Sequence, residues 1–102
     1  MKQEQIKHIV FIEVVNIDID IKKENVALLK SKLLGLSKFI DKIIELEVGD
    51  NFSTRSSFDI ALSVVFVNEE DLNEYRRHPK HVEVLEFMKT LVLKTTVVDY
   101  YF

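Results

Sequence analysis

Residues 6–15 carry apolar side chains on both sides of a predicted β-strand, and this feature constrains the fold more than any other. A strand turns successive side chains to opposite faces, so a strand that is apolar at both sets of positions has to be buried on both faces. One set holds Ile6, Val10, Ile12 and Val14, and the other holds Ile9, Phe11 and Val15. The chain therefore needs a layer of structure on each side of its sheet.

Length and composition indicate one globular domain. The 102 residues contain no linker rich in glycine, serine or proline, and no cysteine, which excludes disulfides and cysteine-based zinc sites. A net charge of −3 argues against nucleic acid as the main partner, because phosphate binding needs a surplus of Lys and Arg. No apolar run is long enough to span a membrane and no signal peptide is visible, so we expect a cytoplasmic protein.

A helix and two further strands are predicted in the first two thirds of the chain. Residues 22–36 repeat apolar side chains at helical spacing, with possible aspartate caps before them and Gly35 near their end. Residues 43–48 and 58–67 are predicted as strands, joined by a turn and an exposed polar loop at 51–57. One apolar stripe of the later strand is predicted to be buried, and it consists of Phe58, Ile60, Leu62, Val64 and Phe66.

Pro79 divides the next helical stretch into two helices. Asn68 is a capping residue, and the helix that it begins has to end before Pro79, because proline cannot continue it. Proline is favoured in the first turn of a helix, so His78 is predicted to cap a further helix over 79–94. Residues 95–101 form the last strand. The resulting order predicts the βαββαβ arrangement of a ferredoxin-like α+β sandwich.

One face of this sheet requires a cover that the chain itself does not supply. Both helical stretches would lie on the same face, so the other face would expose a contiguous apolar patch. A second copy of the sheet is the simplest cover, which predicts a two-fold symmetric homodimer. The patch is expected to contain Ile9, Phe11, Val15, Ala61, Val65, Val67 and either Val97 or Val98.

Three histidines are the candidates for chemistry. His8 lies on the strand face of Val10 and Ile12, where a buried imidazole needs hydrogen-bond partners or has to remain neutral. Such a histidine is more often a satisfied core residue than a catalyst. His78 is explained as a helix cap, whereas His81 has no such explanation.

A metal site would need three or four converging ligands, and no metal-binding or phosphate-binding motif is present, so we expect no metal and no cofactor.

Other polar groups have structural explanations. The serines of 51–57 lie in the exposed loop and carry no nucleophile motif. The acidic residues 69–71 suit the N-terminus of a helix. We interpret Arg76 and Arg77 as part of a solvated face.

The segment 74–82, EYRRHPKHV, resembles the His-Pro-x-His signature of the stress-responsive A/B barrel (Dabb) family. Three further segments agree with that family in order and spacing, at 7–10, 58–59 and 97–100. The resemblance covers nearly the whole chain. It implies one Dabb domain over residues 1–102, folded as a dimeric α+β barrel.

The same resemblance implies a site. Relatives include a plant polyketide cyclase, in which a histidine and a tyrosine near the signature work in a pocket between sheet and helices. The matching residues are His81 as general base, Tyr75 as its orienting and hydrogen-bonding partner, and His8 on the first strand. The implied chemistry is proton abstraction next to a carbonyl, followed by aldol-type ring closure. The cyclase also has a tyrosine on its first helix, and residues 22–36 contain none, so its substrate does not carry over.

The sequence leaves three functions open. The first is a module that binds a small apolar or carbonyl-containing molecule, the second a cofactor-independent cyclase-like enzyme using His81 and Tyr75, and the third a purely structural dimer. A haem-degrading monooxygenase ranks below these, because nothing beyond lone histidines suggests an axial ligand. A pocket of about 300 Å³ or more onto which His8, Tyr75 and His81 converge favours binding or catalysis, and a filled core favours the structural role.

Overall fold

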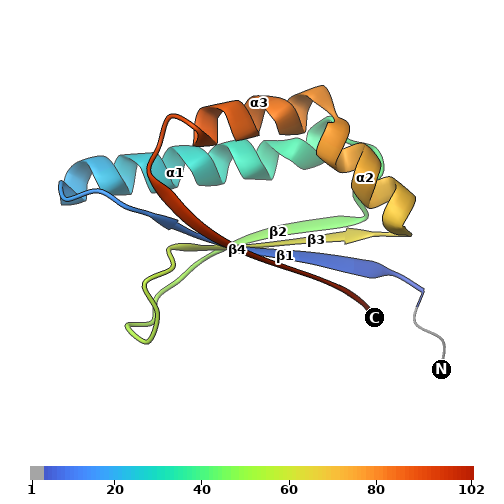
Figure 1. The fold of residues 1–102 in the computed structure, drawn as a ribbon, viewed down its shortest axis with the longest axis horizontal. Helices are drawn as coiled ribbons and strands as arrows, with labels where there is room; N and C mark the ends of the chain where they lie inside the picture. The colour runs from blue at the N-terminus through green and yellow to red at the C-terminus, as the bar shows by residue number, and fades with distance from the viewer. Residues whose placement is uncertain (1–3) are drawn as a thin grey trace.

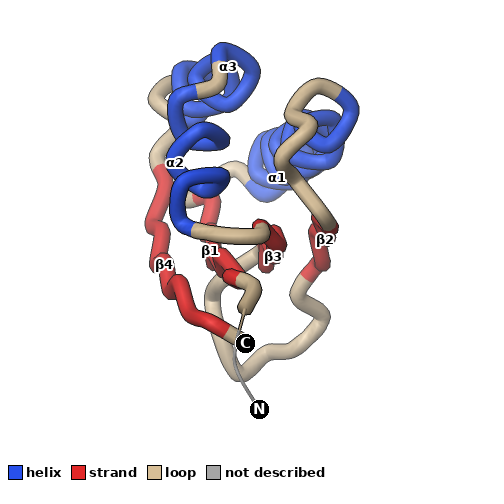
Figure 2. The backbone as a smooth tube through the Cα atoms, turned by 90° about the vertical axis from the view of Figure 1, so that its right-hand side faces the viewer, coloured by secondary structure: helices blue, strands red, loops and turns tan. Residues whose placement is uncertain are grey.

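The fold is a four-stranded antiparallel sheet with its helices on one face, as Figure 1 and Figure 2 show. The computed structural model describes residues 4–102. The strands lie in the order β2–β3–β1–β4 across the sheet, which confirms the ferredoxin-like α+β prediction. In chain order the elements are β1 (Ile6–Val14), α1 (Ile19–Gly35), the 3-10 helix η1 (Leu36–Lys38), β2 (Glu45–Asp50), β3 (Ile60–Phe66), α2 (Glu69–Arg77), α3 (Pro79–Met88) and β4 (Leu93–Tyr101).

The hydrophobic core lies between the helices and the sheet face beneath them. Alternate residues of the two central strands point to this face, and Leu29 and Leu33 of α1 are buried against them. Burying one aliphatic or aromatic side chain contributes roughly 1.5–3 kcal/mol, so these alternate positions fix which way both strands face. The core residues of β1 and β3 are Ile6, Ile12, Val14, Ile60, Leu62, Val64 and Phe66.

Capping side chains set where the first two helices begin. The Asp18 carboxylate accepts hydrogen bonds from the backbone N–H groups of Asp20 and Ile21, at 2.9 and 3.1 Å. The helix α1 therefore begins at Ile19, ahead of the predicted residue 22. Asn68 caps α2 by accepting from the backbone N–H of Asp71 at 2.9 Å, as the sequence predicted.

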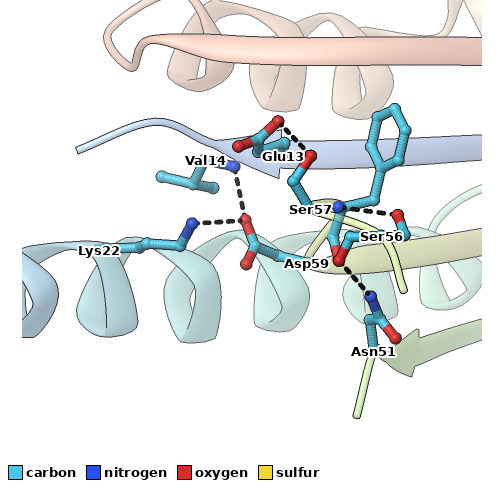
Figure 3. A network of polar contacts seen from close by, with 8 residues as sticks. Glu13, Val14, Lys22, Asn51, Ser56, Ser57 and Asp59 are labelled. Carbon is cyan, nitrogen blue, oxygen red and sulfur yellow. Dashed lines mark hydrogen bonds and ion pairs between the residues drawn. The ribbon is translucent and has the colours of Figure 1, made fainter. Parts of the chain in front are cut away.

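The start of β3 differs from the sequence prediction. Phe58 is not part of the buried stripe, because its ring packs against Phe11, on the sheet face away from the helices, with ring centroids 5.8 Å apart. Figure 3 shows the cause: the Asp59 carboxylate accepts from the Val14 backbone N–H at 2.8 Å and pairs with Lys22 of α1 at 3.3 Å. These contacts turn Asp59 toward α1 and Phe58 away from it, so the regular strand begins two residues later.

The ends of β2 and α3 also differ from those predicted. The strand β2 runs to Asp50, because backbone pairing with β3 continues to that residue, so Gly49 lies in the strand and not in a turn. The helix α3 ends at Met88 and not near residue 94. The backbone N–H and the hydroxyl of Thr90 both donate to the Phe87 carbonyl, at 2.9 and 2.6 Å, which turns the chain into β4.

The sheet face away from the helices, which we call the outer face, is partly apolar and exposed. Phe11 and Val98 on this face are 40% and 51% exposed. The register pairs Ile9 with Val98 and Val10 with Val97, so Val98 belongs to the outer face and Val97 points to the helix side. Val65 is an exception to the predicted patch, because it is already buried within the single chain.

Candidate functional site

His8 is held by a carboxylate on the neighbouring strand. It points to the helix side of β1, is buried, and stands opposite Asp99 in the β1–β4 register. The His8 Nδ1 atom lies 2.5 Å from Asp99 Oδ1, and Arg76 Nη2 donates to Asp99 Oδ2 at 3.0 Å. Because an ionised carboxylate only accepts, His8 Nδ1 carries the proton of this hydrogen bond. Arg76, Asp99 and His8 thus form one polar chain from the surface to the core.

Tyr75 lies at the centre of the site. It belongs to the last turns of α2 and is 1% exposed. Its ring centroid lies 5.9 Å from that of His8, 4.4 Å from that of His81 and 5.0 Å from that of Phe66. Its hydroxyl is the one buried side-chain nitrogen or oxygen within residues 4–102 that has no hydrogen-bond partner. Burial raises the pKa of the Tyr75 phenol, so the group stays protonated and can act as a donor.

His81 is positioned by the break between α2 and α3. Pro79 begins α3, and His78 caps it by accepting from the Lys80 backbone N–H at 3.1 Å, as predicted. The Arg76 carbonyl therefore lacks its usual helical partner and accepts from His81 Nδ1 at 3.1 Å. Because a carbonyl only accepts, the proton of His81 is on Nδ1, and Nε2 carries a free lone pair.

The surroundings favour the neutral form of His81. Burial lowers the pKa of its imidazole most, and the neighbouring His8, Arg76 and His78 side chains lower it further. The hydrogen bond to the Arg76 carbonyl acts in the opposite direction and is outweighed. A neutral imidazole with an unprotonated Nε2 can accept a proton at neutral pH.

His8, Tyr75 and His81 line one cavity of about 190 Å³ between the sheet and the helices. The structure thus brings together the three residues that the sequence singled out, from β1, α2 and α3. Most of the remaining wall is aliphatic and includes Leu62 and Met88. The cavity is smaller than the roughly 300 Å³ that we took as a sign of ligand binding. A binding role for this cavity is therefore inferred from its polar groups and not from its volume.

Asp99 and Arg76 belong to this site, and the sequence did not reveal their role. Arg76 is half exposed, as a solvated face would be, yet its guanidinium is paired with the carboxylate that holds His8. Asp99 and His8 are 91 positions apart in the chain. They meet only once β1 and β4 are paired in register. The strand register is therefore the information needed to predict this contact, and a single sequence does not determine it.

A larger hollow elsewhere lacks comparable chemistry. An open groove of about 770 Å³ lies along α1, beside the loop-proximal ends of β2 and β3. Its Lys22 and Lys30 are paired with Asp59 and Asp50, so their charges are balanced. Within residues 4–102, no three His, Asp or Glu side chains are placed to hold a metal ion. In the same part of the chain, no helix has the length and apolar character needed to cross a bilayer.

Comparison with protein families matches residues 6–102 to the Stress responsive A/B Barrel Domain. The chain belongs to the Dabb family. This confirms the family expected from the His-Pro-x-His segment and the spacing of the other three segments. A search of curated proteins found no match.

Solved structures share the fold of this Dabb protein. A dimeric protein of unknown function and ferredoxin-like fold from Bacteroides fragilis has a TM-score of 0.88 and 28% identity, over 96% of each chain. The hydroxynitrile lyase from Passiflora edulis has a TM-score of 0.82 and 19% identity, over 99% of this chain and 95% of that one. A Dabb family protein from Mesorhizobium loti has a TM-score of 0.73 and 20% identity, over 96% of each chain. These similarities establish the fold but not the activity, which has to be inferred from the residues of the site.

Proposed function

We propose that this Dabb protein binds a small carbonyl compound in the cavity between its sheet and helices. The observation that carries the proposal is the buried Tyr75 hydroxyl, which has no protein partner. Leaving a buried donor unsatisfied costs about 1–3 kcal/mol, and a ligand oxygen that accepts from Tyr75 would remove this cost. A carbonyl oxygen is such an acceptor, since it has two lone pairs and no proton of its own.

The other groups of the cavity restrict the ligand further. The free Nε2 lone pair of His81 favours a ligand with a hydroxyl or an acidic C–H beside its carbonyl. The aliphatic part of the wall favours an apolar body. The cavity of about 190 Å³ is below the range of roughly 300–1,000 Å³ found for drug-sized ligands. The ligand class is therefore small carbonyl compounds with an acidic neighbouring proton, such as β-dicarbonyls.

Catalysis on the same ligand is a second candidate, and the neutral state of His81 favours it. In this reaction His81 Nε2 takes a proton from the carbon next to the carbonyl, and the C–H electron pair becomes an enolate. The enolate oxygen accepts from the Tyr75 hydroxyl. The enolate carbon then either regains the proton from His81 or attacks a second carbonyl carbon, whose C=O π electrons move to its oxygen, and that oxygen takes the proton back from His81. The Passiflora edulis hydroxynitrile lyase, an enzyme with the same fold, supports an enzymatic role.

Calorimetry with a panel of small aldehydes, ketones and β-dicarbonyl compounds tests the binding proposal. We expect saturable binding that is lost in Tyr75→Phe and kept in Ser37→Ala, which removes a hydroxyl from an exposed position outside the cavity and the outer face. Equal binding by Tyr75→Phe contradicts the hydroxyl contact, and a wild type that binds nothing favours the purely structural dimer. If the ligand is also converted, His81→Gln should lower turnover by about 10²–10⁴-fold.

We also propose that the protein is a homodimer whose two sheets pack by their outer faces. Phe11, Val98 and Tyr100 are 40–51% exposed on this face, and each would contribute to association if a partner covered it. The relative from Bacteroides fragilis is a dimeric protein, which supports a dimer here, while the choice of the outer face depends on the exposed apolar side chains. A permanent interface of this kind buries on the order of 2,000 Å² or more in total.

A further inference from the structure

The strand β4 is the least supported wall of the cavity. Within residues 4–102 it lies at the edge of the sheet and pairs with β1 alone. Its first residue, Leu93, is partly covered, and the other eight residues are exposed. Two side-chain contacts join it to α2, Arg76–Asp99 and Glu69–Tyr101. Contacts between such exposed groups contribute little to stability, so β4 depends mainly on its hydrogen bonds to β1.

The same strand belongs to both the cavity and the outer face. Thr95 and Val97 line the cavity, and Asp99 holds His8. The alternate residues Val98 and Tyr100 point to the outer face. Val98 is paired with Ile9, directly beside the pairing of Asp99 with His8. A partner that packs on Val98 therefore rests against the strand at the position where that strand holds the imidazole of His8.

We propose that the second copy of the chain completes the cavity, because its sheet holds β4 in place from the outer face. This inference rests on the proposed homodimer and extends the proposed function. A strand that is bonded along one edge and exposed on its faces opens locally at low cost in free energy. Burial of Val98 and Tyr100 by a partner raises the cost of that opening. The Asp99–His8 contact and the Val97 wall are then formed in the dimer and fluctuate in the monomer.

The consequence is a coupling between assembly and ligand binding. Any ligand that needs the formed cavity binds the dimer more tightly than the monomer, and by reciprocity the ligand strengthens the dimer. The apparent affinity for the carbonyl probe should therefore rise with protein concentration until the dimer saturates. A site built within one rigid chain would show no such dependence.

Amide hydrogen exchange without any ligand tests the coupling, so its outcome is independent of whether the cavity binds a carbonyl compound. The test variant is Val98→Asp, which places a charge on the outer face. The matched control is Leu28→Asp, a similarly exposed position on α1. Light scattering gives the mass of each variant, and exchange is compared between the β4 amides bonded to β1 and the amides of β3.

We expect Val98→Asp to be monomeric, with β4 amides exchanging about tenfold faster or more and β3 amides nearly unchanged, while Leu28→Asp behaves like wild type. A monomeric Val98→Asp with wild-type protection of β4 overturns the coupling. A Val98→Asp that stays dimeric overturns the assignment of the interface. If the variant does not fold, wild-type protein diluted through its dissociation range replaces it. Exchange of β4 must then accelerate on dilution, and a constant rate overturns the proposal.

Discussion

At the scale of single residues, Tyr75 should show a conflict between stability and binding. Tyr75→Phe removes a buried hydroxyl that has no protein partner, so we expect the free energy of unfolding to stay level or to rise by about 1 kcal/mol. Binding of the carbonyl probe should be lost in the same variant. Urea unfolding and calorimetry on one preparation check both effects. A clear loss of stability would show that the hydroxyl has a structural partner and would contradict its assignment as the ligand donor.

His81 should make stability depend on pH near neutrality. Burial lowers its pKa in the folded chain below the unfolded value of about 6.5, so the unfolded chain takes up the proton first as the pH falls. The contribution of neutral His81 is complete above about pH 6.5 and is lost as the pH falls through the lowered folded pKa. The free energy of unfolding should therefore rise with pH across this window.

The variant His81→Gln isolates this contribution. It should reduce the slope of the free energy of unfolding against pH just below pH 6.5, measured by urea unfolding at several pH values. Arg77→Gln, which changes an exposed charge at the end of α2, serves as the control and should keep the wild-type slope. An unchanged slope in His81→Gln would mean that His81 has the same pKa in both states and that its neutrality at the site is not enforced by burial.

The residues of the site were only partly accessible from the sequence. His81 and Tyr75 lie in one short motif, and His8 shares a strand face with apolar residues, so local pattern was enough to single them out. Asp99 lies in another matched segment but shows its role only through its register with His8. The tautomer of His81 depends on the Arg76 carbonyl, which is available because Pro79 interrupts the helix. Such three-dimensional consequences of a local break are not visible in residue types alone.

At the scale of elements, Asp59 should be the residue that joins β1, β3 and α1. Its carboxylate accepts from the Val14 backbone N–H and pairs with Lys22, and its own backbone N–H donates to the Ile12 carbonyl at 2.8 Å. Asp59→Ala leaves the Val14 N–H without its partner, so we expect a loss of about 1–3 kcal/mol in the free energy of unfolding. Asp41→Ala, at an exposed position in the connection after η1, is the control. Equal stability of the two variants would contradict this role.

The same aspartate shows where sequence periodicity fails. The order of strands and helices, the caps at Asn68 and His78, and the buried stripe from Ile60 to Phe66 all follow from local patterns, and the structure confirms them. Periodicity assigns Phe58 to the same stripe, because it assumes that alternation continues unbroken. The Asp59 contacts reverse the direction of the side chains at that point. A side chain that bonds to the backbone of another strand can override the alternation of inward and outward side chains. Because such partners are distant in the chain, sequence periodicity does not reveal this effect.

At the scale of the whole molecule, the exposed outer face predicts the assembly. Light scattering after size exclusion should give twice the 12.0 kDa chain mass at micromolar concentration. Phe11→Glu should shift the mass toward the monomer, because it places a charge in the apolar patch. A well-folded wild-type monomer would contradict the dimer and, with it, the view that the outer face is a protein interface.

In the proposed site, a neutral His81 and the Tyr75 hydroxyl bind the carbonyl ligand together. Side-chain nitrogen NMR of His81 at neutral pH, with and without 2,4-pentanedione as the probe, tests it most directly. We expect a neutral ring protonated at Nδ1 in the free protein. Addition of the probe should change the Nε2 signal saturably, and this change should be absent in Tyr75→Phe. A ring that is protonated at Nε2, or an Nε2 signal that does not respond to the probe, would show that His81 does not bind the ligand in this way.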